Sequence, residues 1–362
     1  MMKRTLRDGL FSMKNYSLAC LLACSSCVDK IELPDSEHPP VAMLVEGKFI
    51  AGTPGHVTAS VFELYTNPNE LPKAIGGAQV VLQDDQGHEL ALFSGYNGEY
   101  YRDVPAGNAA FPVLTGSRYR LVATLPGGRI YQSAWETLLP AVPVDSVHAE
   151  IATREVLDNM GKVDTVKMFR FNVDTDLHYP GLDAPVHFRW ELGQSYRITD
   201  DYDKICYSLR ALLQDNVIIF DNTLAKQDRL NNYILGETRL DYRFAEGYYF
   251  ILYQQSISEN ACGYLAELYQ LLQKKGTPFD PPAGSIRSNM TSPTDPDIPV
   301  HGFFYVAAQD TARLYISPET AGNPAPYCPI PPSIGGGSGP PNACDDCLLE
   351  AGGQLEKPDW WQ

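Results

Sequence analysis

The chain has 362 residues, of which 44% are apolar and 20% charged, a balance typical of a globular protein rather than a disordered one. It contains 29 Gly and 28 Pro, which favours many turns and short strands over a helical bundle. The formal net charge of −16 argues against a nucleic-acid partner, because an acidic surface repels phosphate. No apolar run approaches the roughly 20 residues of a membrane-spanning helix.

Residues 1–26 have the features of an export signal, in which a basic start precedes a short apolar stretch that ends in small residues. The cysteines at its end resemble a bacterial lipoprotein signal, which is cleaved before a Cys that then carries the lipid. Cys24 has the better apolar residue three places before it, and Cys27 follows the better small residues. We expect the lipid anchor on Cys27, with Cys24 as the alternative. An ordinary secretory signal is the competing interpretation.

Residues 27–40 are polar and end in two prolines, which predicts an extended tether. Residues 41–140 then carry about seven strand patterns separated by short turns. In residues 56–65, Val57, Ala59 and Val61 alternate with polar side chains, as expected of a half-buried strand. This spacing predicts an immunoglobulin-like β-sandwich that lacks the usual cysteine pair.

Residues 139–143 contain two prolines and predict a domain boundary. Five further strand patterns follow, at 144–151, 167–173, 186–192, 216–220 and 248–253. We therefore expect a mainly β protein in which the sandwich is followed by a larger β domain, over 141–362, that is itself a sandwich or barrel-like.

The second β domain is expected to carry one amphipathic helix near 259–275. Ser258 is a candidate cap, and Ala261, Leu265, Leu268 and Leu272 recur at helical spacing. Such a helix packs on a sheet or closes the end of a barrel. Residues 318–343 are rich in Pro and Gly and predict a long surface loop ahead of a cysteine-containing tail.

Five cysteines follow Cys27, and an exported chain lives where disulfides persist. Cys344-Asp-Asp-Cys347 lacks the further ligands of a zinc site and the helical context of a redox site. We expect disulfides among Cys206, Cys328, Cys344 and Cys347, with Cys328 bonded to Cys344 or Cys347. Cys262 lies in the expected helix and is predicted to remain a buried free thiol.

The search for catalytic motifs gives no nucleophile elbow, phosphate loop or paired metal ligands, and the seven His are dispersed. The acidic stretches 199–203 and 295–297 fit solvated loops, with a loose Ca²⁺ contact as the alternative. We therefore expect no enzyme activity, no cofactor and no metal. Acid pairs of the glycosidase kind meet only in the folded chain, so a hydrolase with dispersed acids stays a less favoured alternative.

Aromatic residues give the only candidates for ligand contact. Trp360 and Trp361 near the C-terminus, with Tyr248 and Tyr249 in a strand pattern, can stack on a sugar or a peptide. The competing interpretation is that the terminal pair fastens the tail onto the domain.

Several short motifs, in one order along the chain, resemble a family of Bacteroidota outer-membrane lipoproteins with a domain of unknown function, DUF4249. They include Leu44-Val-Glu-Gly47, Gly77-Ala-Gln-Val-Val81, Cys344-Asp-Asp-Cys347 and Lys357-Pro-Asp-Trp-Trp361. Further pieces lie at 27–33, 85–87, 98–100, 116–121, 128–133, 255–258, 276–282 and 301–304. One departure is Ser288-Asn289, where the family usually has Gly-Asn.

The resemblance implies an outer-membrane lipoprotein that is often encoded beside a TonB-dependent receptor, and it carries over no catalytic residues. We expect a lipid-anchored, non-enzymatic accessory or binding subunit of such a β-barrel transporter. A surface glycan- or peptide-binding module is the alternative.

Overall fold

The computed structural model describes residues 42–64, 71–157, 160–212, 217–223, 227–273, 286–328 and 342–361. The expected signal and tether, including Cys24 and Cys27, lie outside these residues, as does half of the expected Pro/Gly loop, residues 329–341. In the part of the chain that is described, no helix has the length and apolar character needed to cross a membrane.

One large sheet runs through the structure in the order β21-β14-β13-β17-β20-β1-β2-β7-β6, and three short strands pair beside this path. Most neighbours are antiparallel, whereas β1 pairs in parallel with β19 and β20. Its strands are β1 (Ala42–Ala51), β2 (Gly55–Leu64), β3 (Lys73–Ala74), β6 (Phe93–Ser94), β7 (Glu99–Val104), β13 (His187–Thr199), β14 (Ile205–Ala211), β15 (Ile218–Asp221), β17 (Tyr248–Ile257), β19 (Val300–His301), β20 (Phe304–Ile316) and β21 (Gly353–Gln354).

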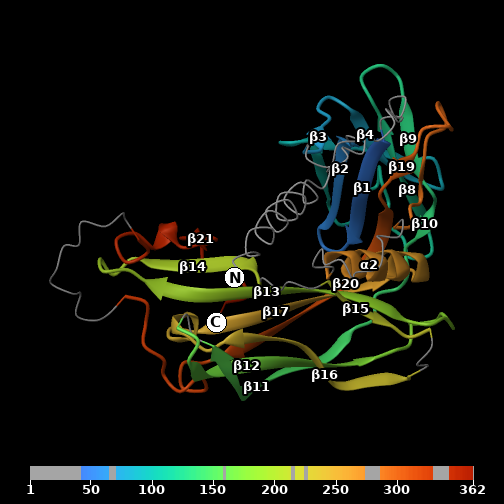
Figure 1. The fold of residues 1–362 in the computed structure, drawn as a ribbon. Coiled ribbons are helices and arrows are strands. Elements are labelled where there is room, and N and C mark those ends of the chain that lie inside the picture. The colour runs from blue at the N-terminus through green and yellow to red at the C-terminus, as the bar shows by residue number, and fades with distance from the viewer. Residues whose placement is uncertain are drawn as a thin grey trace, which may run out of the picture. The chain divides into compact units, whose positions relative to one another are not determined.

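Two smaller sheets pack against this large one and form with it a first and a second sandwich, respectively (Figure 1). The first contains β4 (Gln79–Asp84), β5 (Glu89–Ala91), β8 (Arg118–Thr124), β9 (Ile130–Ser133), β10 (Glu136–Thr137) and β18 (Met290–Thr291). The second contains β11 (Val144–Leu157), β12 (Val163–Asp176) and β16 (Arg229–Arg239). Outside the sheets, the described part of the chain also forms the helix α2 (Glu259–Leu272) and the 3₁₀ turns η1 (Tyr242–Phe244) and η2 (Cys347–Leu349).

The alternating pattern of β2 determines which of its faces is buried. Val57, Ala59 and Val61 are all at most 2% exposed and pack into the core of the first sandwich, as the sequence predicts. Because side chains alternate along a strand, the intervening residues lie on the opposite face of the sheet.

Strand β20 belongs to both sandwiches. Residues 304–308 pair with β1, and residues 308–316 pair with β17. Phe304 and Val306 accordingly lie in the core of the first sandwich, while Ile316 lies in the core of the second. The first sandwich therefore takes in residues from 290–308, which lie far along the chain from its other strands.

Helix α2 packs on the face of the large sheet opposite the two cores. The Ser258 hydroxyl accepts a hydrogen bond from the Ala261 amide and caps the first turn, as predicted. Tyr264 stacks on Phe303 with ring centroids 4.7 Å apart, and Tyr305 lies in the same apolar cluster. The helix ends at Leu272, three residues before the expected end, with Gln273 as its C-cap.

The prediction of a mainly β protein is confirmed, the described residues form one α-helix, and none of their sheets closes into a barrel. The barrel-like alternative for the second domain is therefore wrong. Strands β14 and β16 are not among the sequence predictions, because their charged and polar residues interrupt the apolar runs.

Candidate functional site

The exposed face of the large sheet beside α2 carries a cluster of charged side chains. The ladder register sets Arg189 beside Gln255, and Gln255 beside Gln309, on three adjacent strands. Arg189 and Glu191 are two residues apart in β13, so both side chains lie on this face. The buried residues Phe188 and Trp190 alternate with them and point into the core.

Glu191 joins two cations. Its Oε1 lies 2.7 Å from Nζ of Lys48, which comes from β1, and 2.6 Å from Nη1 of Arg189. The same Arg189 nitrogen donates a 2.5 Å hydrogen bond to the hydroxyl of Tyr305 on β20. Three strands of the sheet, β1, β13 and β20, are thus linked by one charged network, which we call the Glu191 network (Lys48, Arg189, Glu191 and Tyr305).

Burial and charge act in opposite directions on the acids of this region. Burial alone would raise the pKa of the Glu191 carboxyl, but the charges of Arg189 and Lys48 outweigh it and hold that pKa below its usual value. Glu46, on the same face of β1, forms no ion pair with the described residues, and burial raises its pKa. The network therefore keeps one carboxylate ionised beside a second that is desolvated.

A cavity of about 620 Å³ opens next to this network, between β13, β14, β17 and the end of α2. Its volume lies in the range of small-molecule sites, about 300–1,000 Å³. Gly193 and Tyr253 lie on its floor, and Leu209 and Leu272, both exposed, lie on its rim. Arg189 and Glu191 line one side, so the cavity combines an apolar floor with a charged end.

A smaller cavity of about 230 Å³ lies between α2 and the strands β1 and β2. Arg189 lines both cavities, and Lys48 and Tyr305 line the smaller one. The Glu191 network therefore separates two hollows on the same face of the sheet. We take the larger cavity and this network together as the candidate binding site.

The two C-terminal tryptophans pack on the far end of this sheet face. Trp361 is 8% exposed and lies 4.8 Å from Tyr249 and 5.2 Å from Tyr207, ring centroid to centroid. Trp360 lies 5.1 Å from Tyr249, and the Arg313 guanidinium lies over its ring at 4.9 Å. The pair fastens the tail to the sheet, and Tyr253 connects this cluster to the larger cavity.

Tyr248 does not belong with the candidate ligand-stacking residues. It is fully buried in the core of the second sandwich and stacks on Phe244, with centroids 4.0 Å apart. Because neighbouring strand residues point to opposite faces, Tyr248 and Tyr249 cannot share one ligand. The expectation that Tyr248 contacts a ligand is therefore wrong.

The four candidate cysteines form two disulfides, Cys206–Cys347 and Cys328–Cys344, and Cys262 is the buried free thiol that the sequence predicts. Disulfides form and persist in oxidising compartments, so this pair indicates an extracytoplasmic location. Burial raises the pKa of the Cys262 thiol to about 12. This thiol is therefore no candidate for an activated nucleophile.

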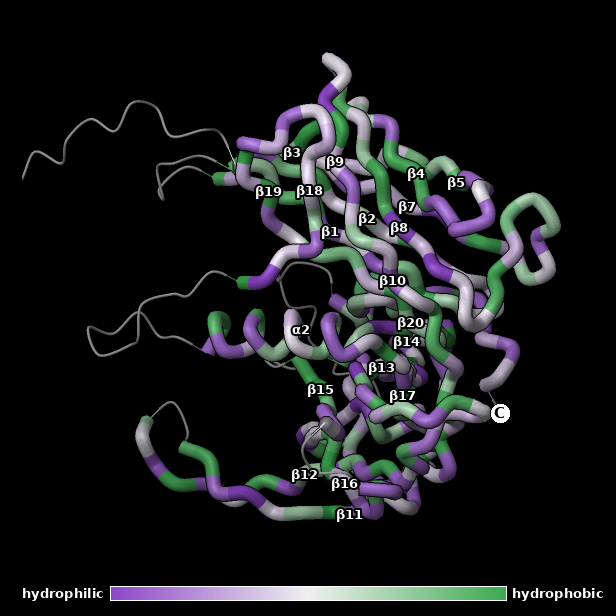
Figure 2. The backbone as a smooth tube through the Cα atoms, turned by 90° about the vertical axis from the view of Figure 1, so that its right-hand side faces the viewer, coloured by the Kyte–Doolittle hydropathy of each residue, from purple (hydrophilic) through white to green (hydrophobic). Residues whose placement is uncertain are grey.

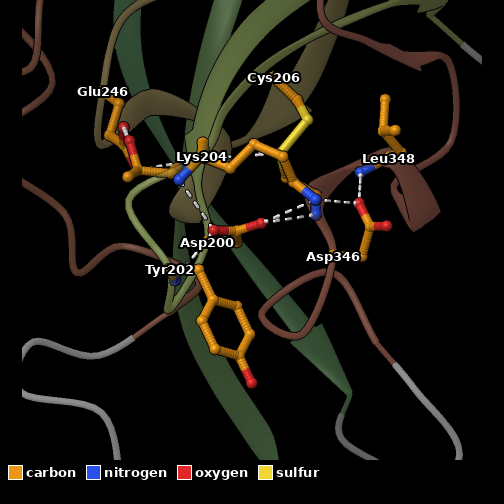
Figure 3. Close-up of a disulfide and its surroundings, with 9 residues drawn as sticks. Asp200, Tyr202, Lys204, Cys206, Glu246, Asp346 and Leu348 are labelled. Atoms are coloured by element: carbon orange, nitrogen blue, oxygen red, sulfur yellow. Dashed lines mark hydrogen bonds and ion pairs between the residues drawn. A yellow bond between two sulfur atoms is a disulfide. The ribbon is translucent and has the colours of Figure 1, made fainter.

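Asp200 organises the surroundings of the first disulfide (Figure 3). Its carboxylate accepts hydrogen bonds from the backbone amides of Tyr202, Lys204 and Cys347 at 2.9–3.3 Å. Burial would raise the pKa of Asp200, but these bonds lower it overall. In the acidic stretch 199–203, residues 201–203 are exposed, as expected of a solvated loop, whereas Asp200 is 4% exposed and is hydrogen-bonded within the turn.

A second exposed feature is the end of the hairpin formed by β11 and β12. Leu157 is 71% and Val163 54% exposed, and they face each other across the ladder. Ile151 and Val156 are exposed on the same hairpin. β11 is the edge strand of its sheet, and Figure 2 shows apolar segments near the hairpin end. Exposed apolar side chains beside an open strand edge are typical of a docking surface.

Arg189, Glu191 and Lys48 are not among the residues predicted from the sequence. The alternation of charged with large apolar residues in 187–192 could have placed Arg189 and Glu191 on one exposed face. No local signal connects them to Lys48, because that contact spans 143 residues.

A family model described as "Domain of unknown function (DUF4249)" matches residues 29–313. This match includes most of the motifs quoted above and ends before Cys344-Asp-Asp-Cys347 and the terminal tryptophans. No curated protein gives a significant match.

Proposed function

Because the chain belongs to the DUF4249 family and carries the disulfides of an extracytoplasmic protein, we propose that it is a lipid-anchored outer-membrane protein. In this proposal it acts without enzyme activity, as an accessory or binding subunit of a TonB-dependent β-barrel transporter. The basic start and the small residues before Cys24 and Cys27 support the lipid anchor.

The observation that carries the partner role is the exposed apolar end of the β11–β12 hairpin. Leu157 and Val163 would leave water on docking, and burying such side chains contributes roughly 1.5–3 kcal/mol each. The open edge of β11 can also pair with a strand of the partner, a recurrent mode of recognition.

The test is co-purification of the lipidated chain from detergent-solubilised membranes of the organism that encodes it. An outer-membrane β-barrel protein should co-purify with the native chain and not with a Leu157→Asp/Val163→Asp variant. Leu71→Asp is the matched control, because Leu71 is 85% exposed and lies outside the hairpin. If the native chain and the double variant bring down the same proteins, the hairpin does not dock the partner.

Mass spectrometry of the mature chain tests the anchor separately. An acyl mass increment on an N-terminal Cys27, or on Cys24, is the expected result. Stable attachment requires more than one acyl chain, because a single chain binds membranes only marginally. A mature chain with neither cysteine acylated would exclude the anchor.

The cavity favours a second candidate function, a module that binds a glycan or a peptide. Its apolar floor at Tyr253 can contact a sugar ring or an apolar side chain, and Arg189 and Glu191 can pair with polar groups. A glycan array and a peptide array probed with the purified chain test this function. Absence of reproducible binding on both arrays would count against it.

A further inference from the structure

Three groups of His, Cys, Asp and Glu among the described residues lie close enough to share a metal ion. Two of them use sulfur atoms that are already in disulfides, since Cys344 is bonded to Cys328 and Cys347 to Cys206. The third consists of His187, Asp221 and Cys262, whose thiol is free. We call this third group the His187 cluster.

The topology brings the three residues of the His187 cluster together from three elements. In the ladders of β13, His187 lies opposite Asp221 of β15 on one side and opposite Ile257 of β17 on the other. Helix α2 begins two residues after Ile257 and presents Cys262 in its second turn. The candidate ligand atoms of the cluster lie within 4.8 Å of one another.

The imidazole of His187 is buried, and its Nδ1 faces the carboxylate of Asp221 without a well-aligned hydrogen bond. The residue is 3% exposed, and its Nδ1 is buried without a hydrogen bond. Oδ1 of Asp221 lies 3.1 Å away, but the alignment does not make a hydrogen bond, and this oxygen accepts one from the Thr223 amide instead. A buried nitrogen without an aligned hydrogen bond is unfavourable, so the position of Nδ1 leaves room for a further partner.

The free thiol of Cys262 is buried and makes only a weak polar contact. Cys262 is 1% exposed, and its Sγ makes one weak contact, 3.9 Å from the carbonyl oxygen of Phe220. The other four cysteines of the described chain are paired in disulfides. A nitrogen without an aligned hydrogen bond and a free thiol therefore lie in one buried group beside a carboxylate.

We propose that His187, Asp221 and Cys262 bind a thiophilic divalent cation of the Zn²⁺ class through one nitrogen, one oxygen and one sulfur. Zn²⁺ accepts this combination of ligands, at about 2.0–2.2 Å for nitrogen and oxygen and about 2.3 Å for sulfur. Two such ligands in tetrahedral geometry lie roughly 3.3 Å apart, close to the separation of the His187 and Asp221 atoms. The side chain of Asp221 is 56% exposed, which leaves the fourth position open to water.

Binding requires no redox partner. The Cys262 S–H bond breaks, its proton passes to solvent, and the thiolate forms a bond to the cation. The bound ion would connect the start of α2 to β13 and β15. This inference does not depend on the proposed partner or ligand, and it replaces the sequence-based expectation that the chain holds no metal.

The test uses the purified, disulfide-bonded chain with Zn²⁺ or Co²⁺ alone as the probe. After stripping with EDTA, reloading and exhaustive dialysis, elemental analysis should find about one equivalent of Zn²⁺. Co²⁺ loading should give a thiolate-to-cobalt charge-transfer band in the near ultraviolet. Cys262→Ser should lose this band, and Asp221→Asn should weaken Zn²⁺ binding at least about tenfold.

His178→Gln is the matched control, because His178 also lies near a carboxylate, that of Asp228, but is exposed and outside the cluster. It should bind Zn²⁺ like the native chain. Circular dichroism in EDTA shows whether each variant is folded. If Cys262→Ser does not fold, Zn²⁺ binding by Asp221→Asn tests the proposal instead, because the side chain of Asp221 is exposed and its replacement should leave the fold intact. The proposal would be overturned if the native chain retained no Zn²⁺ after dialysis, or if Asp221→Asn retained as much Zn²⁺ as the native chain.

Discussion

Lys48 on β1 and Glu191 on β13 form an ion pair of 2.7 Å although 143 residues separate them in the chain. β1 contributes to the core of the first sandwich, and β13 contributes to that of the second. Their side chains therefore join two parts of the structure that otherwise share strand β20.

Replacing Glu191 should destabilise the chain more than replacing Lys48. Lys48→Gln leaves Glu191 paired with Arg189, and the pair is about one-third exposed, so we expect a loss below about 1 kcal/mol. Glu191→Gln leaves two cations close together without their shared anion. Urea unfolding at pH 7 measures both losses, and an equal or larger loss for Lys48→Gln would contradict the central role of Glu191.

Glu191→Gln should also change how the stability of the chain depends on pH. The pKa of Glu191 is lowered in the folded chain, so its contribution is complete above the unfolded value of about 4.3 and is lost as the pH falls through the folded value. Glu191→Gln should therefore show a shallower loss of stability on acidification below about pH 5. The free energies of unfolding of the native chain and of Glu191→Gln are measured between pH 3 and pH 7. If they fall in parallel as the pH is lowered, the ionised Glu191 carboxylate does not stabilise the fold.

Gly193 allows the floor of the larger cavity to stay open. A Cβ at this position would lie 3.2 Å from the Tyr253 ring and 3.3 Å from Cβ of Ile251. Gly193→Val should therefore fill the cavity and abolish binding of any ligand found on the arrays, at a cost of about 1–3 kcal/mol in stability. Gly76→Val is the control, since no atom lies within 4 Å of its Cβ. Unchanged ligand binding by Gly193→Val would place the ligand elsewhere.

Local patterns predicted the strands that have one buried face. Val57, Ala59 and Val61 alternate with polar residues in the sequence and are buried in the structure. The capping position of Ser258 also follows from local chemistry, because a hydroxyl there can accept a hydrogen bond from the first turn of the helix.

Long-range relationships could not be predicted in this way. Four cysteines allow three pairings, and only the fold brings Cys206 next to Cys347. Tyr248 and Tyr249 are similar in sequence, but the side of the sheet that each faces depends on the register of β17. The Glu191 network and the His187 cluster each combine residues from several strands, so no local spacing reveals them.

Asp200→Ala should destabilise the chain by roughly 2–4 kcal/mol. Its carboxylate accepts from the amides of Tyr202, Lys204 and Cys347, and removing it leaves these donors without their acceptor. The lowered pKa of Asp200 means that its contribution is present above about pH 4 and is lost as the pH falls through the folded value.

The neighbouring Asp201→Ala is the matched control, because the side chain of Asp201 is exposed. It should change stability by less than about 0.5 kcal/mol. Thermal unfolding at pH 7, where the Asp200 contribution is present, and at pH 3, where it is being lost, distinguishes the two variants. If both variants unfold like the native chain, the hydrogen bonds of Asp200 do not support the Cys206–Cys347 region.

The two disulfides should contribute unequally to stability. Cys206 and Cys347 are 141 residues apart, whereas Cys328 and Cys344 are 16 apart. A cross-link restricts the unfolded chain more when it closes a longer loop, which gives upper values of about 5 kcal/mol and about 3 kcal/mol. Cys206 and Cys347 are also fully buried in the core of the second sandwich, so their loss removes packing as well.

Guanidinium unfolding of Cys206→Ala/Cys347→Ala and of Cys328→Ala/Cys344→Ala measures both contributions. Cys262→Ala, unfolded in EDTA, is the control for losing a buried sulfur without losing a cross-link. We expect the order of destabilisation to be the long-loop pair, then the short-loop pair. A short-loop variant that loses as much stability as the long-loop variant would show that the unfolded chain is already restricted between Cys206 and Cys347 by other means.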